Sequence, residues 1–225
     1  MYEKELTALL ESNGVCACGF ADVSDSLPED VPQNLVYAVS FAYKLSGAII
    51  KTIADRPSIM YFQHYRAVNS KLDLIALEVC RFIEDKGCDA FPIAASQSRP
   101  DKKYDGVFSH KTAAVRAGLG FIGKNALLIN PEYGPGIRLA TVLTDMPLEI
   151  NRIKYENLCG SCDACVKACP AKAISGKAYT PGMEREDFFD AKACSENMKK
   201  YNDIGRGAVC GICMSVCPFT KYHKH

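Results

Sequence analysis

Cys159-Gly160-Ser161-Cys162-Asp163-Ala164-Cys165-Val166-Lys167-Ala168-Cys169-Pro170 is the stretch that limits the fold most, because its spacing is C-x2-C-x2-C-x3-C-P. In this spacing three neighbouring thiolates wrap around one cuboidal [4Fe-4S] cluster, and the fourth cysteine ligates a second cluster. Structural zinc sites use two separated C-x2-C pairs instead, and disulfide frameworks do not suit a reducing compartment. The stretch therefore predicts a module that holds two iron–sulfur clusters, with a short helix beginning at Cys169.

A second run, Cys210-Gly211-Ile212-Cys213-Met214-Ser215-Val216-Cys217-Pro218, has the end of the same spacing but lacks its first cysteine. The missing ligand must come from elsewhere, and Cys194 is the only other cysteine after residue 150. In two-cluster ferredoxins the last cysteine of each run ligates the other cluster. This crossed ligation pattern predicts that cluster one is held by Cys159, Cys162, Cys165 and Cys217. Cluster two is then held by Cys169, Cys194, Cys210 and Cys213.

The composition narrows the class of protein. The chain has 225 residues with a formal net charge of +1, and 48% of its residues are hydrophobic. Eight cluster thiolates and two oxidised clusters would bring the charge to about −3, which does not indicate a broadly basic nucleic-acid binder. No apolar stretch is long enough for a membrane span, and the first residues do not have the features of a signal peptide. We therefore expect a cytoplasmic protein that does not enter a membrane, with Cys16, Cys18, Cys80 and Cys88 as buried, inert thiols.

The rest of the chain predicts an α+β fold, because helices and strands mix without regular βαβ alternation. The pair of strands around residues 130–136 is expected to be an antiparallel hairpin, since the connection is rich in turn residues. Pro147 and the polar stretch after it mark a boundary. We therefore expect a mixed N-terminal domain over residues 1–150 and a bacterial ferredoxin-like two-cluster module over residues 151–225. The predicted elements are helices over 2–13, 59–86 and 110–117, and strands over 15–21, 35–43, 90–94, 126–129 and 137–144.

A glycine-rich loop, Gly118-Leu119-Gly120-Phe121-Ile122-Gly123, lies between a predicted helix and a predicted strand. This order is the reverse of a dinucleotide-binding fingerprint, so a Rossmann fold is disfavoured. Glycines still allow backbone N–H groups to approach an anion or a flat cofactor closely, and Arg116, Lys124 and Asn125 flank the loop. The alternative is a tight turn that packs the helix against the sheet. The residues alone leave these two interpretations open.

The segment Arg116-Ala-Gly-Leu-Gly-Phe-Ile-Gly-Lys-Asn-Ala-Leu-Leu-Ile129, followed by the two cysteine runs, resembles the epoxyqueuosine reductase family and, more distantly, the reductive dehalogenases. Cys194 fits that family's lone ligand between the two runs. The resemblance implies an iron–sulfur oxidoreductase in which electrons pass through both clusters to a cobalamin. It also implies that the loop, with Arg116, Gly118, Gly120, Gly123, Lys124 and Asn125, contacts this cofactor.

The resemblance further implies an acidic proton donor, a tRNA substrate, and an electron donor such as a flavodoxin or a ferredoxin. The family's acidic segment is matched only in part, and Asp105 is the predicted donor with Tyr104 as the alternative. A second hypothesis is a ferredoxin-like electron-transfer or partner protein without its own substrate site. A third is the same architecture with a flavin in place of cobalamin.

Overall fold

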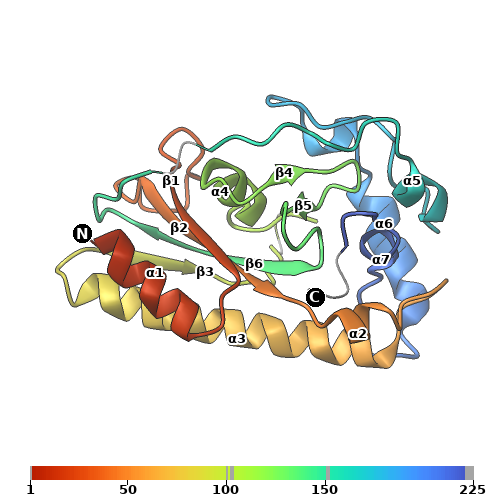
Figure 1. Cartoon of the computed structure of the whole chain (residues 1–225), viewed down its shortest axis with the longest axis horizontal. Helices are drawn as coiled ribbons and strands as arrows, with labels where there is room; N and C mark the ends of the chain where they lie inside the picture. Colours follow the sequence, from red (N-terminus) through yellow and green to blue (C-terminus); the bar gives the residue numbers. More distant parts are fainter. Residues whose placement is uncertain (1, 100, 102–103, 151–152, 221–225) are drawn as a thin grey trace. The chain divides into compact units, whose positions relative to one another are not determined.

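The structure is a computed structural model that describes residues 2–99, 101, 104–150 and 153–220. Helices and strands mix along the chain, so the predicted α+β class is confirmed (Figure 1). The residues form two compact units, and neither unit is continuous in sequence. The sheet unit comprises Met1–Lys44, Val68–Leu119 and Arg138–Tyr155, and the cysteine unit comprises Leu45–Ala67, Gly120–Ile137 and Glu156–His225. The predicted boundary at residue 150 divides the chain differently, because it leaves residues 45–67 and 120–137 with the N-terminal part.

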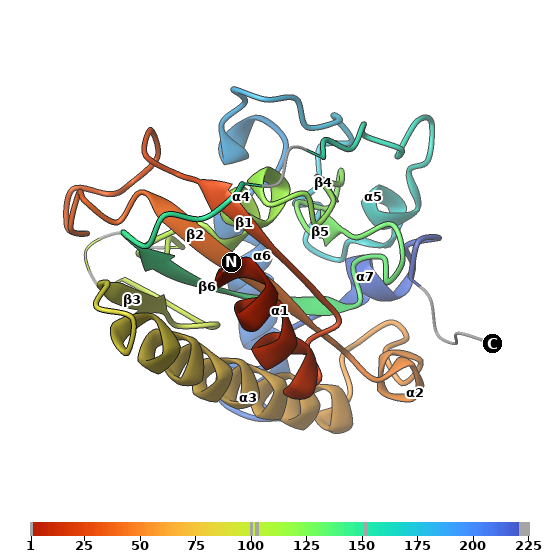
Figure 2. The ribbon, with the colours of Figure 1, turned by 60° about the vertical axis from the view of Figure 1, so that its left-hand side comes forward.

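The sheet unit is built on a four-stranded sheet with the strand order β1-β2-β6-β3. β1 pairs antiparallel with β2, and β3 pairs antiparallel with β6. Alternate residues of β1 point to opposite faces: Cys18 contacts Thr7 of α1, whereas Gly19 lies against the backbone after α4. α1 and α4 therefore cover opposite faces of the sheet (Figure 2). The bounds are α1 Tyr2–Ser12, β1 Ala17–Asp22, β2 Tyr37–Lys44, β3 Ala90–Ile93, α4 His110–Arg116 and β6 Ile137–Thr144.

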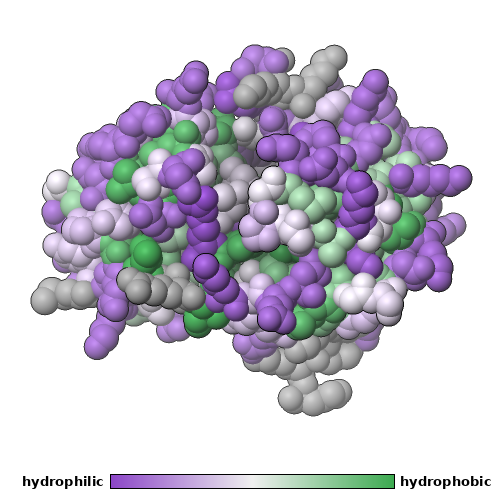
Figure 3. All heavy atoms as spheres, turned by 90° about the horizontal axis from the view of Figure 1, so that it is seen from above, coloured by the Kyte–Doolittle hydropathy of each residue, from purple (hydrophilic) through white to green (hydrophobic). Residues whose placement is uncertain are grey.

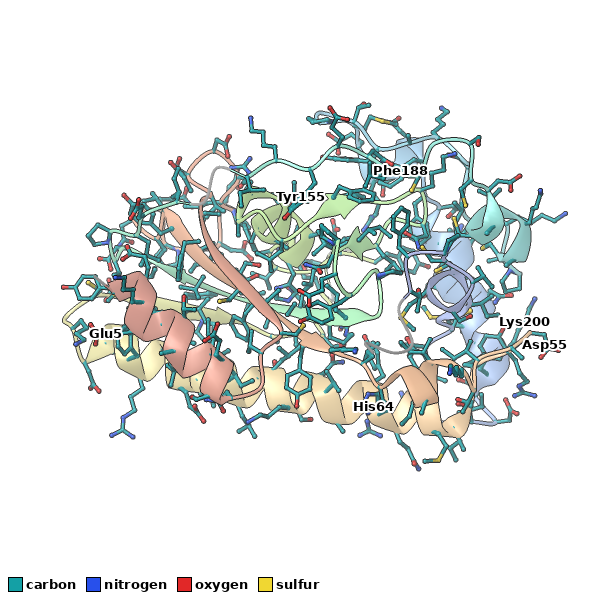
Figure 4. The ribbon with its side chains drawn as sticks, viewed as in Figure 1. Glu5, Asp55, His64, Tyr155, Phe188 and Lys200 are labelled. Carbon is teal, nitrogen blue, oxygen red and sulfur yellow. The ribbon has the colours of Figure 1, made fainter. Side chains whose placement is uncertain are left out.

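The long helix α3 (Ile59–Glu84) confirms the predicted helix and belongs to both units. Its residues Leu72, Ile75 and Val79 are fully buried at helical spacing, as the apolar period predicts. In the cysteine unit, the imidazole of His64 (Figure 4) accepts a hydrogen bond from the backbone N–H of Ser46, at 2.9 Å. His64 is thus a packing residue of the helix. None of the helices in the described residues has the length and apolar character that crossing a membrane requires. On the face in Figure 3, hydrophilic side chains alternate with smaller hydrophobic areas.

The predicted hairpin between residues 126–129 and 137–144 is wrong. β5 (Leu128–Ile129) pairs with β4 (Phe121–Ile122), while β6 pairs with β3. The chain reverses inside the glycine-rich segment, where the N–H of Gly123 donates to the carbonyl of Leu127 at 2.9 Å. The turn-rich segment after β5 forms a separate local turn, because the Asn130 side chain accepts hydrogen bonds from the next backbone N–H groups. The predicted strand over 126–129 contains β5, but β4 has only two residues, too few to show a period, so the sequence did not reveal the partner of β5.

His110 begins α4 and is a half-buried imidazole in the sheet unit. Its Nε2 lies 2.9 Å from the carbonyl oxygen of Ala94, and its Nδ1 lies 2.9 Å from the hydroxyl of Thr141. Burial, opposed by the hydrogen bond to Ala94 and reinforced by the charge of Arg138, lowers the pKa of His110 from 6.5 to about 4. The folded state therefore resists protonation of this side chain.

We expect acidification to destabilise the chain through His110. Between pH 6.5 and pH 4 the unfolded imidazole binds a proton and the folded one does not, so stability falls as the pH falls. The loss from pH 7 to pH 5 should be about 2 kcal/mol, from the shift of the pKa. Denaturant unfolding of the wild type and of His110→Gln at both pH values measures it. Equal losses in the two proteins would contradict the assignment.

Candidate iron–sulfur centre

The first cysteine run is fixed to the cysteine unit by Asn157. Its side-chain oxygen accepts from the backbone N–H of Cys159 at 3.0 Å, and its amide donates to the carbonyl of Ile122 in β4, also at 3.0 Å. The N–H of Cys162 then donates to the carbonyl of Cys159 at 2.9 Å, which closes the loop between the first two cysteines. Asn157 was not predicted from the sequence, where its only local signal is its place two residues before a cysteine, typical of an Asx turn.

Cys169 and Cys194 come together because the segment after Cys169 pairs with the segment before Cys194. Cys169 lies at the end of α5 (Ala164–Ala168), so the prediction of a helix that begins at Cys169 is wrong. The backbone of Cys169 is extended because Pro170 follows it. Ala173 then accepts a hydrogen bond from the N–H of Asp190 at 2.8 Å. Asp190 caps α6 (Ala191–Met198), which carries Cys194 in its first turn. The segment between Cys169 and Cys194 includes η1 (Arg185–Asp187). In the same segment the ring of Phe188, labelled in Figure 4, packs on Tyr179.

The second run forms the short helix α7 (Ile212–Ser215), whose N-cap is Gly211 with φ +73°. A side chain at Gly211 would meet the ring of Tyr61 at 2.7 Å, so only glycine fits between Cys210 and the helix. After Cys217 the ring of Phe219 packs edge-on against Phe121 of β4, with centroids 6.0 Å apart. Figure 4 shows sulfur atoms gathered around α5, α6 and α7.

Neighbouring thiols of the module influence one another's pKa. In one group, burial first and then Cys159, Cys165 and Cys162 raise the pKa of Cys217 to about 11. In the other, burial first and then Cys210 and Cys169 raise the pKa of Cys194 to about 11. Cluster binding must therefore remove protons from the thiols of Cys194 and Cys217. The thiols that act on Cys217 and on Cys194 belong to their own predicted ligand sets, whereas Cys165 of the first set also acts on Cys213 of the second. The assignment of each cysteine to a cluster stays a prediction.

A small cavity, partly open to solvent, lies beside the first group. Among the described residues, no three His, Cys, Asp or Glu side chains are placed to share a single ion. A [4Fe-4S] cluster is held by four thiolates, and soft sulfur donors of this kind suit iron–sulfur chemistry. The donor set therefore fits a cluster. The cavity is lined by Lys124, Asn125, Ile129, Cys159, Cys162, Cys165, Cys217, Pro218 and Phe219.

Lys124 and Asn125 join the glycine loop to both cysteine runs. The ammonium of Lys124, a side chain that is 9% exposed, donates to the carbonyl of Gly160 at 2.8 Å and to that of Cys162 at 3.0 Å. The amide of Asn125 donates to the carbonyl of Cys213 at 3.3 Å. In this structure both side chains hold the cysteine loops. Whether they also contact a further cofactor stays a prediction.

The three glycines of the loop each have a local structural reason. Gly118 has φ +71° and ends α4, with its N–H donating to the carbonyl of Val115 at 3.1 Å, as helix C-terminal glycines do. Gly120 passes so close to the carbonyl of Ile129 that an added Cβ would lie 2.2 Å from the oxygen. A Cβ at Gly123 would lie 2.9 Å from Asn125 Oδ1. These contacts support the tight-turn interpretation, and cofactor binding by the loop stays a prediction.

The remaining predicted site residues lie in the sheet unit. Arg116 forms an ion pair with Asp25 and donates to the carbonyl of Asp22 at 3.2 Å. Tyr104 and Asp105 are exposed on the loop before α4, where Tyr104 has a positive φ of 68°. The carbonyl of Asp105 accepts from the N–H of Arg99 at 3.2 Å. The role of Asp105 or Tyr104 as proton donor therefore stays a prediction.

Comparison with protein families defines the class of the cysteine runs. Residues 158–220 match the family described as the 4Fe-4S double cluster binding domain. This match covers both cysteine runs and Cys194. The C-terminal segment is therefore a double-cluster iron–sulfur domain, as the spacing predicted.

Beyond that domain, the chain is similar to epoxyqueuosine reductases, which confirms the resemblance seen in the glycine loop and the cysteine runs. It is 31% identical to the epoxyqueuosine reductase of Staphylococcus aureus over 190 residues, which are 82% of this chain and 47% of that protein. It is also 31% identical to the tetrachloroethene reductive dehalogenase of Sulfurospirillum multivorans over 160 residues, 68% of this chain and 30% of the dehalogenase. The chain thus spans about half or less of the length of these relatives.

Solved structures have the same fold. A catabolic reductive dehalogenase in complex with 3-bromo-4-hydroxybenzoic acid matches 98% of this chain with a TM-score of 0.77 at 21% identity, over 32% of its own chain. A selenomethionine-labelled epoxyqueuosine reductase matches 100% of this chain with a TM-score of 0.61 at 22% identity, over 68% of its own chain. At these identities the likeness concerns the fold.

Proposed function

We propose that this protein is an iron–sulfur reductase that passes electrons through two [4Fe-4S] clusters to a bound cobalamin, which reduces the substrate. The observation that carries the proposal is the match of residues 158–220, which include both cysteine runs and Cys194, to the 4Fe-4S double cluster binding domain. Lys124 and Asn125 tie these cysteine loops to the glycine loop. These hydrogen bonds connect the loops that would hold the clusters to the glycine loop, which is one of the segments that resemble the reductases.

The second cofactor is inferred from the relatives. One solved dehalogenase of the same fold is named for B12-dependent dehalogenation. Cobalamin would supply a strongly reducing metal centre that accepts electrons one at a time from iron–sulfur clusters. The residues proposed to contact it are those of the loop, from Arg116 to Asn125, with Asp105 or Tyr104 as the proton donor. The chain's own contribution would be to hold the clusters and to place a proton beside the substrate.

The proposed substrate is an epoxide of the epoxyqueuosine type, and the proposed electron donor is a flavodoxin or a ferredoxin. Support comes from the curated relatives of that name and from a solved relative that contains an epoxyqueuosine-modified tRNA stem loop. The net charge of +1 gives little general attraction to tRNA. Recognition would therefore depend on the modified base and on a local surface. A reducing cytoplasm is the proposed location, because it keeps cluster thiols available.

The test is anaerobic purification of the chain from medium that contains cobalamin, followed by cobalt and flavin analysis. We expect one cobalt per chain and reduction of an epoxyqueuosine-modified stem loop in the presence of a chemical reductant. The control substrate is 3-bromo-4-hydroxybenzoic acid, which should be left unchanged. A loaded protein with neither cobalt nor flavin would favour the alternative, an electron-transfer or partner protein without a substrate site.

A further inference from the structure

The loop that leads into α4, residues 104–109, is held by the side chain of Gln97 in the sheet unit. The Oε1 atom of Gln97 accepts hydrogen bonds from the backbone N–H of Val107 at 2.5 Å and from that of Phe108 at 3.3 Å. Its Nε2 atom donates to the carbonyl of Phe108 at 2.8 Å. With the amide turned over, its NH2 group would face two N–H groups, so the three contacts fix its orientation. Both polar atoms of this side chain therefore bind the loop.

Gly106 packs directly on the Gln97 amide. A Cβ at Gly106 would lie 2.5 Å from Oε1 and 2.6 Å from Cδ of Gln97. The loop can therefore reach the amide only because residue 106 has no side chain. The residues that follow anchor the far end of the loop, since Phe108 is 5% exposed and Ser109 caps α4 by accepting from the N–H of Thr112.

His110 supports the Gln97 amide from the side of the sheet. The Nε2 atom of its imidazole lies 3.1 Å from Gln97 Nε2, and its Nδ1 atom lies 2.9 Å from the hydroxyl of Thr141 in β6. Thr141 is fully buried. The Gln97 amide thus lies between the loop and a side chain that is fixed to the sheet, which leaves it little freedom to rotate.

The stretch that Gln97 holds carries both candidate proton donors, and its backbone is unusual there. Tyr104 has φ +68°, a conformation that residues other than glycine adopt rarely and that persists only where neighbouring contacts enforce it. The carbonyl of Asp105 accepts from the N–H of Arg99 at 3.2 Å, which closes the loop near Gln97. Tyr104 and Asp105 are both exposed. The backbone contacts to Arg99 and Gln97 therefore hold this exposed stretch in its unusual conformation.

We propose that Gln97 is a positioning residue that fixes residues 104–108 in one conformation and so presents the proton donor, Asp105 or Tyr104, to the substrate. The inference rests on the proposed function, which supplies the reaction and the donor. A proton donor accelerates its step only while it lies within hydrogen-bond reach of the reacting atom, and small displacements are costly. A loop released from Gln97 carries the same donor but spends less time in the productive arrangement. Loss of Gln97 should therefore lower turnover without removing either cofactor.

The test is Gln97→Ala, which removes both polar atoms. Amide hydrogen exchange followed by mass spectrometry measures the loop directly and needs no activity. We expect exchange in the peptide that contains Val107 and Phe108 to be about tenfold faster, because these amides lose their acceptor. In the loaded enzyme, assayed with an epoxyqueuosine-modified stem loop, we expect kcat to fall about tenfold or more, while KM and the iron and cobalt contents stay unchanged.

Gly106→Ala is a second, independent variant, used also if Gln97→Ala does not fold. Its methyl group would displace the Gln97 amide, so exchange and kcat should change in the same direction. In the double variant the shortened side chain at position 97 leaves room for the methyl group. Gly106→Ala should then add nothing to the effect of Gln97→Ala, and this non-additivity distinguishes a specific contact from a general loss of stability.

The matched control is Gln33→Ala, because Gln33 also binds a loop of the sheet unit, by donating to the carbonyls of Pro28 and Val31 at 2.8 and 2.7 Å. It should leave kcat and the exchange of the loop before α4 unchanged. Unchanged exchange in folded Gln97→Ala, or in Gly106→Ala where the first does not fold, would overturn the inference, and so would faster exchange with an unchanged kcat. A wild-type chain that binds no cobalt and reduces no stem loop would remove the proposed function, whereas the exchange measurement would still decide whether Gln97 holds the loop.

Discussion

Replacement of Cys194 by alanine is expected to lower the iron content of the anaerobically purified chain from about eight to about four per chain. Cys194 is the only cysteine between the two runs, and α6 places it with Cys169 and Cys210. A cubane cluster needs four thiolates, and the incomplete run around Cys210 supplies only two of them beside Cys169. The loss should therefore concern one cluster and leave the other.

The control for this variant is Cys88→Ala. Cys88 is a half-buried thiol in the sheet unit, away from both runs in sequence. Its replacement should leave about eight irons per chain. Iron and protein are measured on the same sample, together with the electron paramagnetic resonance spectrum of the reduced protein. About eight irons in Cys194→Ala would show that the ligand sets are assigned wrongly.

Lys124→Met should have the second large effect, on cluster one. The methionine has a similar length but cannot donate to the carbonyls of Gly160 and Cys162, which Lys124 holds at 2.8 and 3.0 Å. Hydrogen bonds from a charged group contribute about 1.5 to 3 kcal/mol each. We therefore expect the loop of the first run to be destabilised by at least about 3 kcal/mol, with partial loss of cluster one. The buried positive charge also favours the reduced cluster, so the remaining cluster one should have a lower potential.

Lys167→Met provides the comparison for this variant. The Lys167 side chain is 76% exposed and forms a surface pair with Asp163 in the same run, so its contribution should be small. Iron content, denaturant midpoint followed by circular dichroism, and potentials are compared between the two proteins under anaerobic conditions. If Lys124→Met loads fully and unfolds at the same midpoint as Lys167→Met, Lys124 does not stabilise the loop.

The sequence predicted the parts of the molecule that depend on regular spacing. The cysteine runs could be interpreted directly, because ligands to a cluster must recur at short fixed intervals. The helix α3 followed from its apolar period at Leu72, Ile75 and Val79. The α+β class followed from the mixture of segments with a helical and segments with a strand-like apolar period.

The parts that depend on contacts between distant segments could not be predicted. β4 and β5 have two residues each, and their pairing depends on the close approach of Gly120 to the backbone of Ile129. Lys124 was predicted as a cofactor-binding residue from its position beside glycines, whereas the structure shows its ammonium bound to carbonyls about 36 residues away.

The most direct test of the account is the metal content of the wild-type chain, purified without oxygen. Iron, acid-labile sulfide and zinc are measured per chain on one sample, with the electron paramagnetic resonance spectrum after reduction by dithionite. We predict about eight irons and eight sulfides and signals from two reduced clusters. Zinc in place of iron, or about four irons with a single cluster signal, would contradict it.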